Sequence, residues 1–403
     1  MIETDFKEIL NCVACGKSGL VPTLDLGLQP LANDYLQEGS EFETYPLKLN
    51  YCKKCSHSQL SIAMKPSRLF RNYSYVSATS ETLNDYFNSF SSMIFNVHGL
   101  SGKLLDIGSN DGSFLSKFKD TNWMSIGIDP AINLIPISNS LGVTTIPDFF
   151  TERLASLLTS DFNVIVAMNI FAHTSDPIGI LRGIFNCLSE NGAAYIQTSQ
   201  ADMFISGQFD TVYHEHISFF NVKSMKTLVK RSGLYLNDVT IVGIHGNSYL
   251  WKISKKPQND GNFDRELFEL GNGFNSEDLY IKFKALALDK VKEVNLIIDK
   301  YRKQKFKIVA YGSAAKGNTF MNFAGIKLDL LFDDTPQKIG KISPVGGTKV
   351  SNPMQLESIK EPLLIIIPAW NFATEILKKI RTLRKDSNDM YLTYFPEITI
   401  EKV

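Results

Sequence analysis

The stretch Lys103-Leu-Leu-Asp-Ile-Gly-Ser-Asn-Asp-Gly112 leads from a short apolar run into a glycine turn, and it decides the fold class of the chain. Further short apolar runs alternate with helical stretches downstream, at residues 125–129, 163–168 and 194–198. This alternation is typical of βαβ units, in which parallel strands form one sheet and helices cover both of its faces. The sequence therefore predicts an α/β fold built on a parallel sheet.

The rest of the chain extends this pattern. Residues 81–98 predict a helix ahead of the first strand, and residues 239–244 and 249–254 are expected to pair antiparallel at the sheet edge. From residue 276 to about residue 305, apolar residues recur at three- to five-residue steps, which indicates one long amphipathic helix. A second α/β pattern follows, with apolar runs at 307–312, 328–334 and 363–368. We therefore expect two such sheets, joined by the long helix.

Composition narrows the class of protein. The chain has 403 residues, with 42 Lys and Arg against 42 Asp and Glu. This length predicts two or three domains, and a net charge of zero gives no general attraction to nucleic acid. The first residues lack a basic and apolar leader pattern, and no stretch approaches the roughly 18 apolar residues of a membrane span. We therefore expect a cytoplasmic protein whose partners include neither nucleic acid nor membrane.

Four of the five cysteines form two Cys-x-x-Cys pairs: Cys12 with Cys15, and Cys52 with Cys55. Each pair can place two thiolates on one metal ion, and two pairs complete a tetrahedral zinc site. Gly16 lets the first turn close with a positive φ. Four sulfurs leave no open position for water, so the zinc is expected to be structural. The alternatives are four unrelated buried cysteines or disulfides; Cys187, alone in a helical pattern, is expected in the core.

The glycine turn has the features of a cofactor site. Gly108 permits the tight turn, and Gly112 permits the close approach of a helical run expected from Ser113, whose free N–H groups face any ligand bound there. Asp129 ends the next strand, 21 residues beyond Gly108. A carboxylate at this place commonly accepts hydrogen bonds from two ribose hydroxyls.

The charge of the turn distinguishes two classes of cofactor. A dinucleotide needs glycine at the position of Asn110, whereas the acidic Asp106 and its neighbour Asp111 favour a ligand with a sulfonium and an ammonium group. We therefore expect S-adenosylmethionine rather than NAD, and a βαβ unit without ligand is the alternative. Further candidate cofactor-binding residues follow the third and fourth strands: Asp148 for the adenine amino group, Phe149 for the adenine ring, and Asn169.

Tyr213-His-Glu-His216 is the densest cluster of titratable groups in the chain. It lies beyond the fifth predicted strand, on the side where open parallel sheets bind ligands. Imidazole is well matched to proton transfer near neutral pH, and an adjacent carboxylate can orient it. His173, just past the fourth strand, is expected to point into the same crevice. Acid–base catalysis is therefore the favoured interpretation, with metal binding and plain surface polarity as alternatives.

Taken together, these motifs resemble those of the S-adenosylmethionine-dependent sugar C-methyltransferases, which make branched deoxysugars. The resemblance extends over essentially the whole chain and includes the paired cysteines, the turn at 106–112, Phe171-Ala-His173 and Tyr213-His-Glu-His216. It continues through Tyr311-Gly-Ser-Ala-Ala-Lys-Gly-Asn-Thr319, Asp333-Asp334 with Pro336, Lys338 and Gly340, and Ala369-Trp-Asn371. It implies a zinc-binding domain at 1–75, a Rossmann-like methyltransferase domain at 76–257 and a C-terminal Rossmann-like domain at 258–403.

The resemblance also implies a reaction. The family's substrates are nucleotide-linked hexoses with a keto group at position 4, which acidifies the neighbouring C–H bond. By analogy, His216 removes that proton, and the enolate carbon then takes the methyl group in an in-line displacement. Tyr213 and Glu215 would orient substrate and base, and His173 would donate to the developing enolate oxygen.

Other positions match the family less closely. Tyr75 matches a family tyrosine that reaches the active site, although Tyr73 lies only two residues away. The turn at 312–317 resembles a phosphate-binding turn with Lys316 available to an anion, and the alternative is a scaffold domain that closes over the active site. His245-Gly-Asn-Ser-Tyr-Leu250 lacks an arginine of the family pattern, which suggests a different sugar nucleotide.

Three other functions compete with sugar C-methylation. The methyl acceptor is alternatively the oxygen or nitrogen of another small metabolite. A non-enzymatic scaffold of zinc ribbon and Rossmann-like modules is a second alternative, and an NAD-dependent dehydrogenase or epimerase is a third. Because the three-part chain can bury its own crevice, we expect it to work as a monomer.

Overall fold

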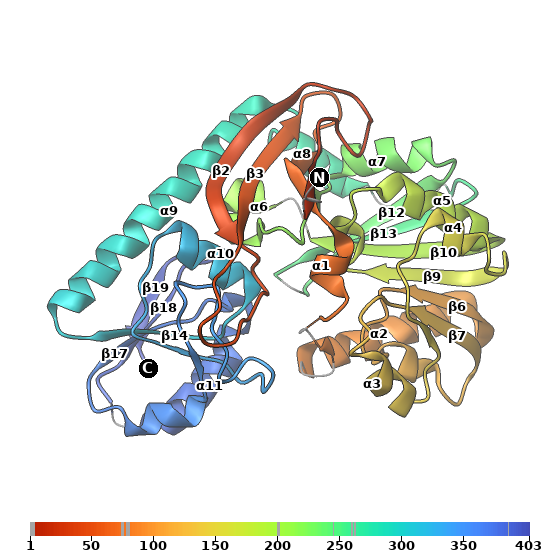
Figure 1. Cartoon of the computed structure of the whole chain (residues 1–403). Coiled ribbons are helices and arrows are strands. Elements are labelled where there is room, and N and C mark those ends of the chain that lie inside the picture. Colours follow the sequence, from red (N-terminus) through yellow and green to blue (C-terminus); the bar gives the residue numbers. More distant parts are fainter. Residues whose placement is uncertain are drawn as a thin grey trace. The chain divides into compact units, whose positions relative to one another are not determined.

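The structure is a computed structural model that describes residues 5–73, 76–77, 81–199, 202–244, 246–258, 261, 263–385 and 387–403 (Figure 1). The chain divides into two compact units, each assembled from separate stretches. The first unit comprises Met1–Val21, Asn50–Ala201 and Glu215–Glu277, and the second comprises Pro22–Leu49, Asp202–His214 and Asp278–Val403.

A seven-stranded sheet forms the centre of the first unit, in the order β12-β13-β10-β9-β6-β7-β8. Strands β6, β7, β8, β9 and β10 are parallel, whereas β13 and β12 are added antiparallel at one edge. The α/β class and the antiparallel edge pair are therefore confirmed. The strand bounds are β6 Ser101–Ile107, β7 Asn122–Ile128, β8 Thr145–Ile146, β9 Phe162–Met168, β10 Leu188–Ser199, β12 Tyr235–Val242 and β13 Ser248–Ser254.

Helices cover this sheet because their apolar faces need burial. Phe87, Phe90 and Ile94 of the predicted N-terminal helix pack into the core cluster that includes Leu104 of β6. Cys187 is buried at the end of a helix and is a core residue, as expected. The helices of the first unit are α1 Pro66–Phe70, α2 Glu81–His98, α3 Ile135–Ser140, α4 Glu152–Ala155, α5 Pro177–Cys187, α7 Val222–Arg231 and α8 Asp264–Gly271.

One local expectation is wrong. The helical run predicted from Ser113 is a single 3-10 turn, η2 Leu115–Phe118. Phe114 and Phe118 are buried with their ring centroids 5.4 Å apart, so this short segment is anchored in the core. Asp120 then adopts a left-handed φ of 61°, after which β7 begins. The glycine turn is therefore not followed by the long helix of a dinucleotide-binding unit.

The remaining strands of the first unit form two small antiparallel pairs. Strand β1 Phe6–Glu8 pairs with β5 Ile62–Met64, and β4 Ser58–Leu60 pairs with β11 Ser218–Phe219. Because β4 follows the second cysteine pair directly, the metal-binding region and the main α/β chain share a small sheet.

The second unit is built on a six-stranded sheet in the order β16-β15-β14-β17-β18-β19, in which only β19 is antiparallel. The predicted second sheet is therefore confirmed. Its strands are β14 Lys307–Tyr311, β15 Leu330–Phe332, β16 Val350–Ser351, β17 Leu363–Ile366, β18 Met390–Thr393 and β19 Thr399–Lys402. Its helices include α6 Met203–Ser206, α10 Ala315–Phe323 and α11 Ala373–Leu383.

The long predicted helix is also confirmed, as α9 Glu277–Lys303, along one face of which Phe283, Val294 and Ile298 are buried. A ribbon of two adjacent strands, β2 Leu20–Pro30 and β3 Thr44–Cys52, supplies most of the remaining stretch of the second unit.

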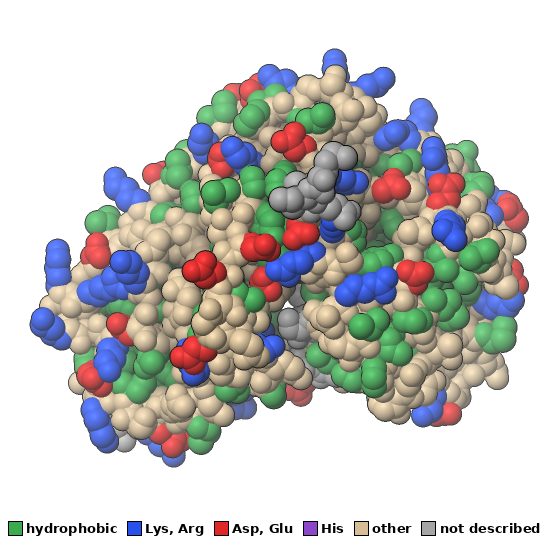
Figure 2. All heavy atoms as spheres, in the orientation of Figure 1, with side chains coloured by type: hydrophobic (Ala, Val, Ile, Leu, Met, Phe, Trp, Pro, Cys, Tyr) green, Lys and Arg blue, Asp and Glu red, His purple; other side chains and the backbone are tan. Residues whose placement is uncertain are grey.

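Charges are mixed on the surface. On the face that Figure 2 shows, Lys and Arg side chains are interspersed with Asp and Glu side chains, so this face carries no extended field of one sign. Among the described residues, no helix combines the length and the apolar composition that crossing a membrane requires.

Candidate functional site

The two cysteine pairs converge in the first unit. The sulfurs of Cys12 and Cys55 lie 3.5 Å apart and those of Cys15 and Cys52 lie 3.7 Å apart, and all four sulfurs fall within 4.8 Å of one another. Four sulfurs bound tetrahedrally to zinc at about 2.3 Å lie about 3.8 Å apart. The four side chains therefore fit a closed zinc site.

Each pair is closed by a matching turn, which we call the first knuckle (residues 12–16) and the second knuckle (residues 52–56). The N–H of Gly16 donates to Cys12 O at 2.7 Å, and the N–H of Ser56 donates to Cys52 O at 2.8 Å. Gly16 and Ser56 occupy the same left-handed position, with φ of 74° and 61°. Gly16 is therefore positioned as its sequence predicts, whereas Ser56 adopts a conformation that glycine takes more readily.

The close approach of the four thiols changes their pKa values. A hydrogen bond from the Cys55 thiol lowers the pKa of Cys12 to about 4, whereas burial raises the pKa of Cys15 to about 11. Neighbouring thiolates repel one another, so a divalent cation is the natural way to keep all four deprotonated.

The glycine turn after β6 lies at the carboxyl end of the first unit's sheet. At Gly108, with φ of 78°, a Cβ atom would lie 2.2 Å from Cγ2 of Ile170, so no larger residue fits. Gly112 has φ of 81° and packs against Ser138. Gly108 thus allows a close turn packed on the segment that follows β9, and Gly112 allows its close approach to α3.

Two carboxylates gather at this turn. Asp129 accepts hydrogen bonds from Asn110 N and Ala131 N, both at 2.8 Å, through different oxygens. Burial raises the pKa of Asp106 to about 8, with the charge of Asp129 as a second cause, and burial also raises the pKa of Asp129. A cationic ligand would lower both pKa values again, so this pair suits a sulfonium and ammonium compound better than a diphosphate.

The remaining predicted cofactor-binding residues follow neighbouring strands at the same end of the sheet. Asn169 has φ of 57°, and its side-chain oxygen accepts a hydrogen bond from Gln197 Nε2 at 3.2 Å. Gln197 Oε1 is buried without a hydrogen-bond partner among the described residues, which leaves one acceptor for a ligand. Asp148 is exposed, and the half-buried ring of Phe149 lies under the Arg71 guanidinium at 5.1 Å.

His173 and His216 meet beside this turn. Their rings stack with centroids 5.2 Å apart, and the Phe70 ring also stacks on His173 with centroids 5.5 Å apart. His216 and Glu215 are 7% and 4% exposed. Burial lowers the pKa of His173 to about 4, so this ring is neutral near pH 7. A neutral His173 does not repel a proton that His216 takes up.

Tyr73, named from the sequence only as the neighbour of the predicted Tyr75, contacts the candidate site. The Tyr73 hydroxyl donates to Glu215 Oε2 at 2.9 Å. The same segment reaches the glycine turn, because Ser77 N donates to Asn110 Oδ1 at 3.0 Å. Tyr75 lies outside the described residues, as does His245. The signal was available in the motif Arg71-Asn-Tyr-Ser-Tyr75, which offers both tyrosines.

The predicted cluster at 213–216 is divided between the units, since Tyr213 belongs to the second unit and Glu215 to the first. His214, also in the second unit, is 2% exposed and packs edge-on against the Tyr45 ring at 6.1 Å. Burial lowers the pKa of His214 to about 4. This histidine is therefore a neutral core residue.

In the second unit, the turn after β14 is engaged by the chain itself. Ser313 N donates to Asp333 Oδ2 at 2.6 Å, and Lys338 Nζ donates to Ser313 O at 2.8 Å. The Tyr35 hydroxyl reaches the same place and bonds Ser313 Oγ at 3.0 Å. Asp333 has the position of a ribose-binding carboxylate, yet it serves backbone and Lys338.

Lys316 of this turn also faces an internal partner. Its ammonium lies 5.1 Å from the ring centroid of Trp370, and the buried carboxylate of Asp210 attracts it. Asp210 in turn accepts a hydrogen bond from Trp370 Nε1 at 2.8 Å. The lysine predicted to serve an anion thus has an anion within the chain.

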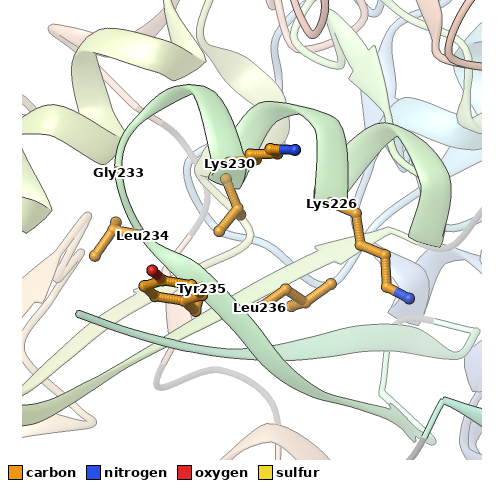
Figure 3. Close-up of a pocket in the computed structure, with 7 residues that line it drawn as sticks. Lys226, Lys230, Gly233, Leu234, Tyr235 and Leu236 are labelled. Carbon is orange, nitrogen blue, oxygen red and sulfur yellow. The ribbon is translucent and has the colours of Figure 1, made fainter. Parts of the chain in front are cut away.

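A separate open pocket of 280 Å³ lies between α7 and β12 of the first unit, lined by Lys226, Val229, Lys230, Gly233, Leu234, Tyr235 and Leu236 (Figure 3). Tyr235 of β12 pairs with Ser254 of β13, and the preceding residue of β13, Ile253, pairs with Ala194 where the pairing of β13 with β10 begins. The pocket is therefore at the opposite end of the sheet from Asp106 and Asp129, and it is no part of the candidate site.

Comparison with known proteins divides the chain into three matched segments. Residues 12–70 match a family model described as a zinc-binding domain, residues 75–239 match a methyltransferase domain, and residues 245–396 match a C-methyltransferase C-terminal domain. C-methyltransferase NovU from Streptomyces niveus is 26% identical over 390 residues, which cover 92% of each chain.

Solved structures match a smaller part. The PH0226 protein from Pyrococcus horikoshii OT3 is 14% identical, with a TM-score of 0.38 over 47% of this chain and 98% of that one. Magnesium protoporphyrin IX methyltransferase from Synechocystis PCC 6803, solved with bound S-adenosylmethionine, is 8% identical, with a TM-score of 0.34 over 43% of this chain and 79% of that one.

Replacing one zinc ligand should abolish metal binding. We expect Cys12→Ser to bind no zinc, where the native chain binds one ion, because three thiolates cannot close the site. The midpoint of thermal unfolding should fall as well, since structural zinc contributes on the order of 10 kcal/mol to folding. Metal analysis and thermal unfolding measure both effects. Cys187→Ala, a matched loss of a buried thiol, should keep its zinc; full zinc content in Cys12→Ser would contradict the site.

Burial of His214 should make the protein sensitive to acid. The folded pKa of about 4 lies below the ordinary value of 6.5, so the unfolded chain takes up a proton first as the pH falls. The free energy of unfolding should therefore decrease between pH 8 and pH 5, by about 2 kcal/mol from this residue. Urea unfolding at both pH values should show a smaller decrease in His214→Leu. Equal decreases in both proteins would argue against this origin.

Proposed function

The chain belongs to the S-adenosylmethionine-dependent C-methyltransferases, and from this premise we propose that it methylates a carbon atom of a nucleotide-linked 4-keto deoxysugar. The observation that carries the proposal is the pairing of buried His216 with His173, beside Glu215, next to the turn after β6. Carbon methylation needs a base, because an unactivated C–H bond is no nucleophile. The buried histidine supplies that base.

In the proposed reaction, His216 removes the proton from the carbon next to the C4 carbonyl. The electron pair of that C–H bond forms a carbon–carbon double bond, and the π pair of the carbonyl moves to its oxygen, which becomes the enolate oxygen. The neutral ring of His173 can still donate an N–H hydrogen bond to this oxygen. Glu215, fixed by the Tyr73 hydroxyl, stabilises the imidazolium of His216, and Tyr213 orients the substrate. When the donor is bound, the enolate carbon would take its methyl group in an in-line displacement, in which the C–S bond breaks, S-adenosylhomocysteine leaves and the carbonyl is restored.

The methyl donor is expected at the carboxyl ends of β6, β7 and β9. When bound, S-adenosylmethionine supplies an electrophilic methyl group. Asp129 offers its carboxylate to the ribose hydroxyls and Asp106 its charge to the cationic part, at the turn formed by Gly108, Asn110 and Gly112. Asp148 and Phe149 would serve the adenine, and Asn169 completes the set.

The compartment, oligomeric state and domain boundaries of the enzyme are also proposed. We place it in the cytoplasm as a monomer, with domains at 1–75, 76–257 and 258–403. None of the five cysteines forms a disulfide, as a reducing compartment favours. The three matched segments support the boundaries, since each lies mainly in one proposed domain.

The base assignment is tested by His216→Asn. We expect kcat to fall at least about 100-fold, because general-base catalysis contributes on that order. The Kd for S-adenosylmethionine, measured by calorimetry, should stay within about twofold, since the donor turn is untouched. The control is His98→Asn, which loses a hydrogen bond between His98 Nε2 and the Tyr195 hydroxyl and should keep its turnover. Full turnover in His216→Asn would show that His216 is not the base.

The substrate class is tested with a panel of sugar nucleotides. We expect release of S-adenosylhomocysteine with 4-keto sugar nucleotides and none with the matching 4-hydroxy compounds, which have no acidified C–H bond. Mass spectrometry of the products should show the added methyl group, and NMR should show a new carbon–carbon bond. A methyl group on oxygen or nitrogen would overturn carbon methylation. Turnover of the 4-hydroxy compounds would overturn the enolate.

A further inference from the structure

The second knuckle is linked to the segment that follows His216 through one pair of strands. Strand β4 begins three residues after Cys55 and pairs antiparallel with β11, with Ser218 opposite Gln59 and Phe219 opposite Ser58. Leu60 N also donates to Ile217 O at 2.9 Å. The backbone that follows His216 is therefore held, from the next residue onward, by the strand that follows the cysteines.

The buried ring of His57 contacts the segment that follows His216 and is linked through Phe220 to the turn that carries His173. His57 has no exposed surface, and its Nε2 lies 3.3 Å from Ser218 Oγ, two residues after His216. Its ring packs on Phe220 at 4.8 Å, and Phe220 packs on Phe171 at 5.2 Å. Phe171 begins the 3-10 turn that ends at His173. One side chain thus supports the segments that carry both histidines.

Gln59 ties the first knuckle to the same strand pair. Its side chain is buried, accepts a hydrogen bond from Val13 N at 2.8 Å and donates to Asn11 O at 3.2 Å. The second knuckle has a further tie, because Asn221 Nδ2 donates to Ser56 O at 2.5 Å. Both knuckles are thus bonded to residues that flank or form the β4–β11 pair.

We propose that the zinc knuckles position the reacting histidines, and that His57 and Gln59 are the positioning residues through which they do so. The inference rests on the proposed function for the roles of His216 and His173. Reacting groups must be held to within fractions of an ångström, and misplacement by about 1 Å from a distant change can cost on the order of 100-fold in rate. A strand pair fixed at a metal site meets that requirement, because its register admits no gradual displacement.

The test compares variants of the full, zinc-loaded chain. His57→Leu keeps a buried apolar side chain but loses the contact with Ser218 Oγ. We expect kcat to fall about tenfold or more, with one zinc per chain and an unchanged Kd for S-adenosylmethionine. His57→Gln, whose amide can bond Ser218 Oγ, should recover most of the rate. A residue that supports stability alone would lower the folded fraction without this pattern of loss and recovery.

Hydrogen exchange supplies a measurement that needs no substrate. In His57→Leu, backbone amides of 216–221 and 171–173 should exchange faster than in the native chain, and the amides of β6 and β7 should not change. The matched control is His98→Leu, which removes a histidine bonded to Tyr195 in the same unit and should leave both regions protected. If no keto sugar nucleotide is turned over, the proposed function fails while this measurement still decides the inference.

Native exchange and native kcat in zinc-loaded His57→Leu would overturn the proposal. If His57→Leu loses its zinc, Ser218→Ala decides, because it removes the hydroxyl and leaves both knuckles intact. We then expect a severalfold lower kcat and faster exchange at 216–221. Native values of both in Ser218→Ala would overturn the proposal.

Discussion

Four cysteine sulfurs within 4.8 Å of one another cannot all be negatively charged unless a cation lies among them. This constraint fixes two turns that are far apart in sequence, the first and second knuckles. The segments bonded to these turns are positioned with them. Strand β4 extends from the second turn, pairs with β11 and so reaches the segment that carries His216. The metal site is therefore a fixed point of the first unit as well as a local source of stability.

Local patterns predict most of the fold. The strands of the first sheet, three of the six strands of the second (β14, β15 and β17) and the helix α9 follow from apolar periodicity, because each depends on which residues must be buried. Strands β16, β18 and β19 were not predicted from the sequence. The cysteine site follows from spacing and the chemistry of thiolates. The helix expected from Ser113 does not form, because burial of Phe114 and Phe118 overrides the local preference of a short segment.

Contacts between side chains that are far apart in the chain could not be predicted from the sequence. Tyr73 and Tyr75 are the same residue type in one short motif, and the hydrogen bond from Tyr73 to Glu215 exists only after folding. Lys316 is a cation at a glycine turn by sequence, yet Asp210 faces it in the structure. Likewise, Tyr35 bonds the turn after β14 across most of the chain length. Zero net charge is uninformative about such buried pairs, because each charge is balanced within the fold.

The discontinuous make-up of the second unit bears on how the protein is made. Strands β2 and β3 leave the ribosome well before α9 and the sheet around β14, which belong to the same unit, are synthesised. Leu24, Leu26, Leu47 and Leu49 of this ribbon are buried in the finished protein, in a unit whose larger part is synthesised later. During that interval the nascent ribbon exposes apolar side chains and strand edges, which are the features that chaperones shield. Completion of this unit thus waits for the synthesis of β14 to β19, whereas local helices of the first unit can form as they emerge.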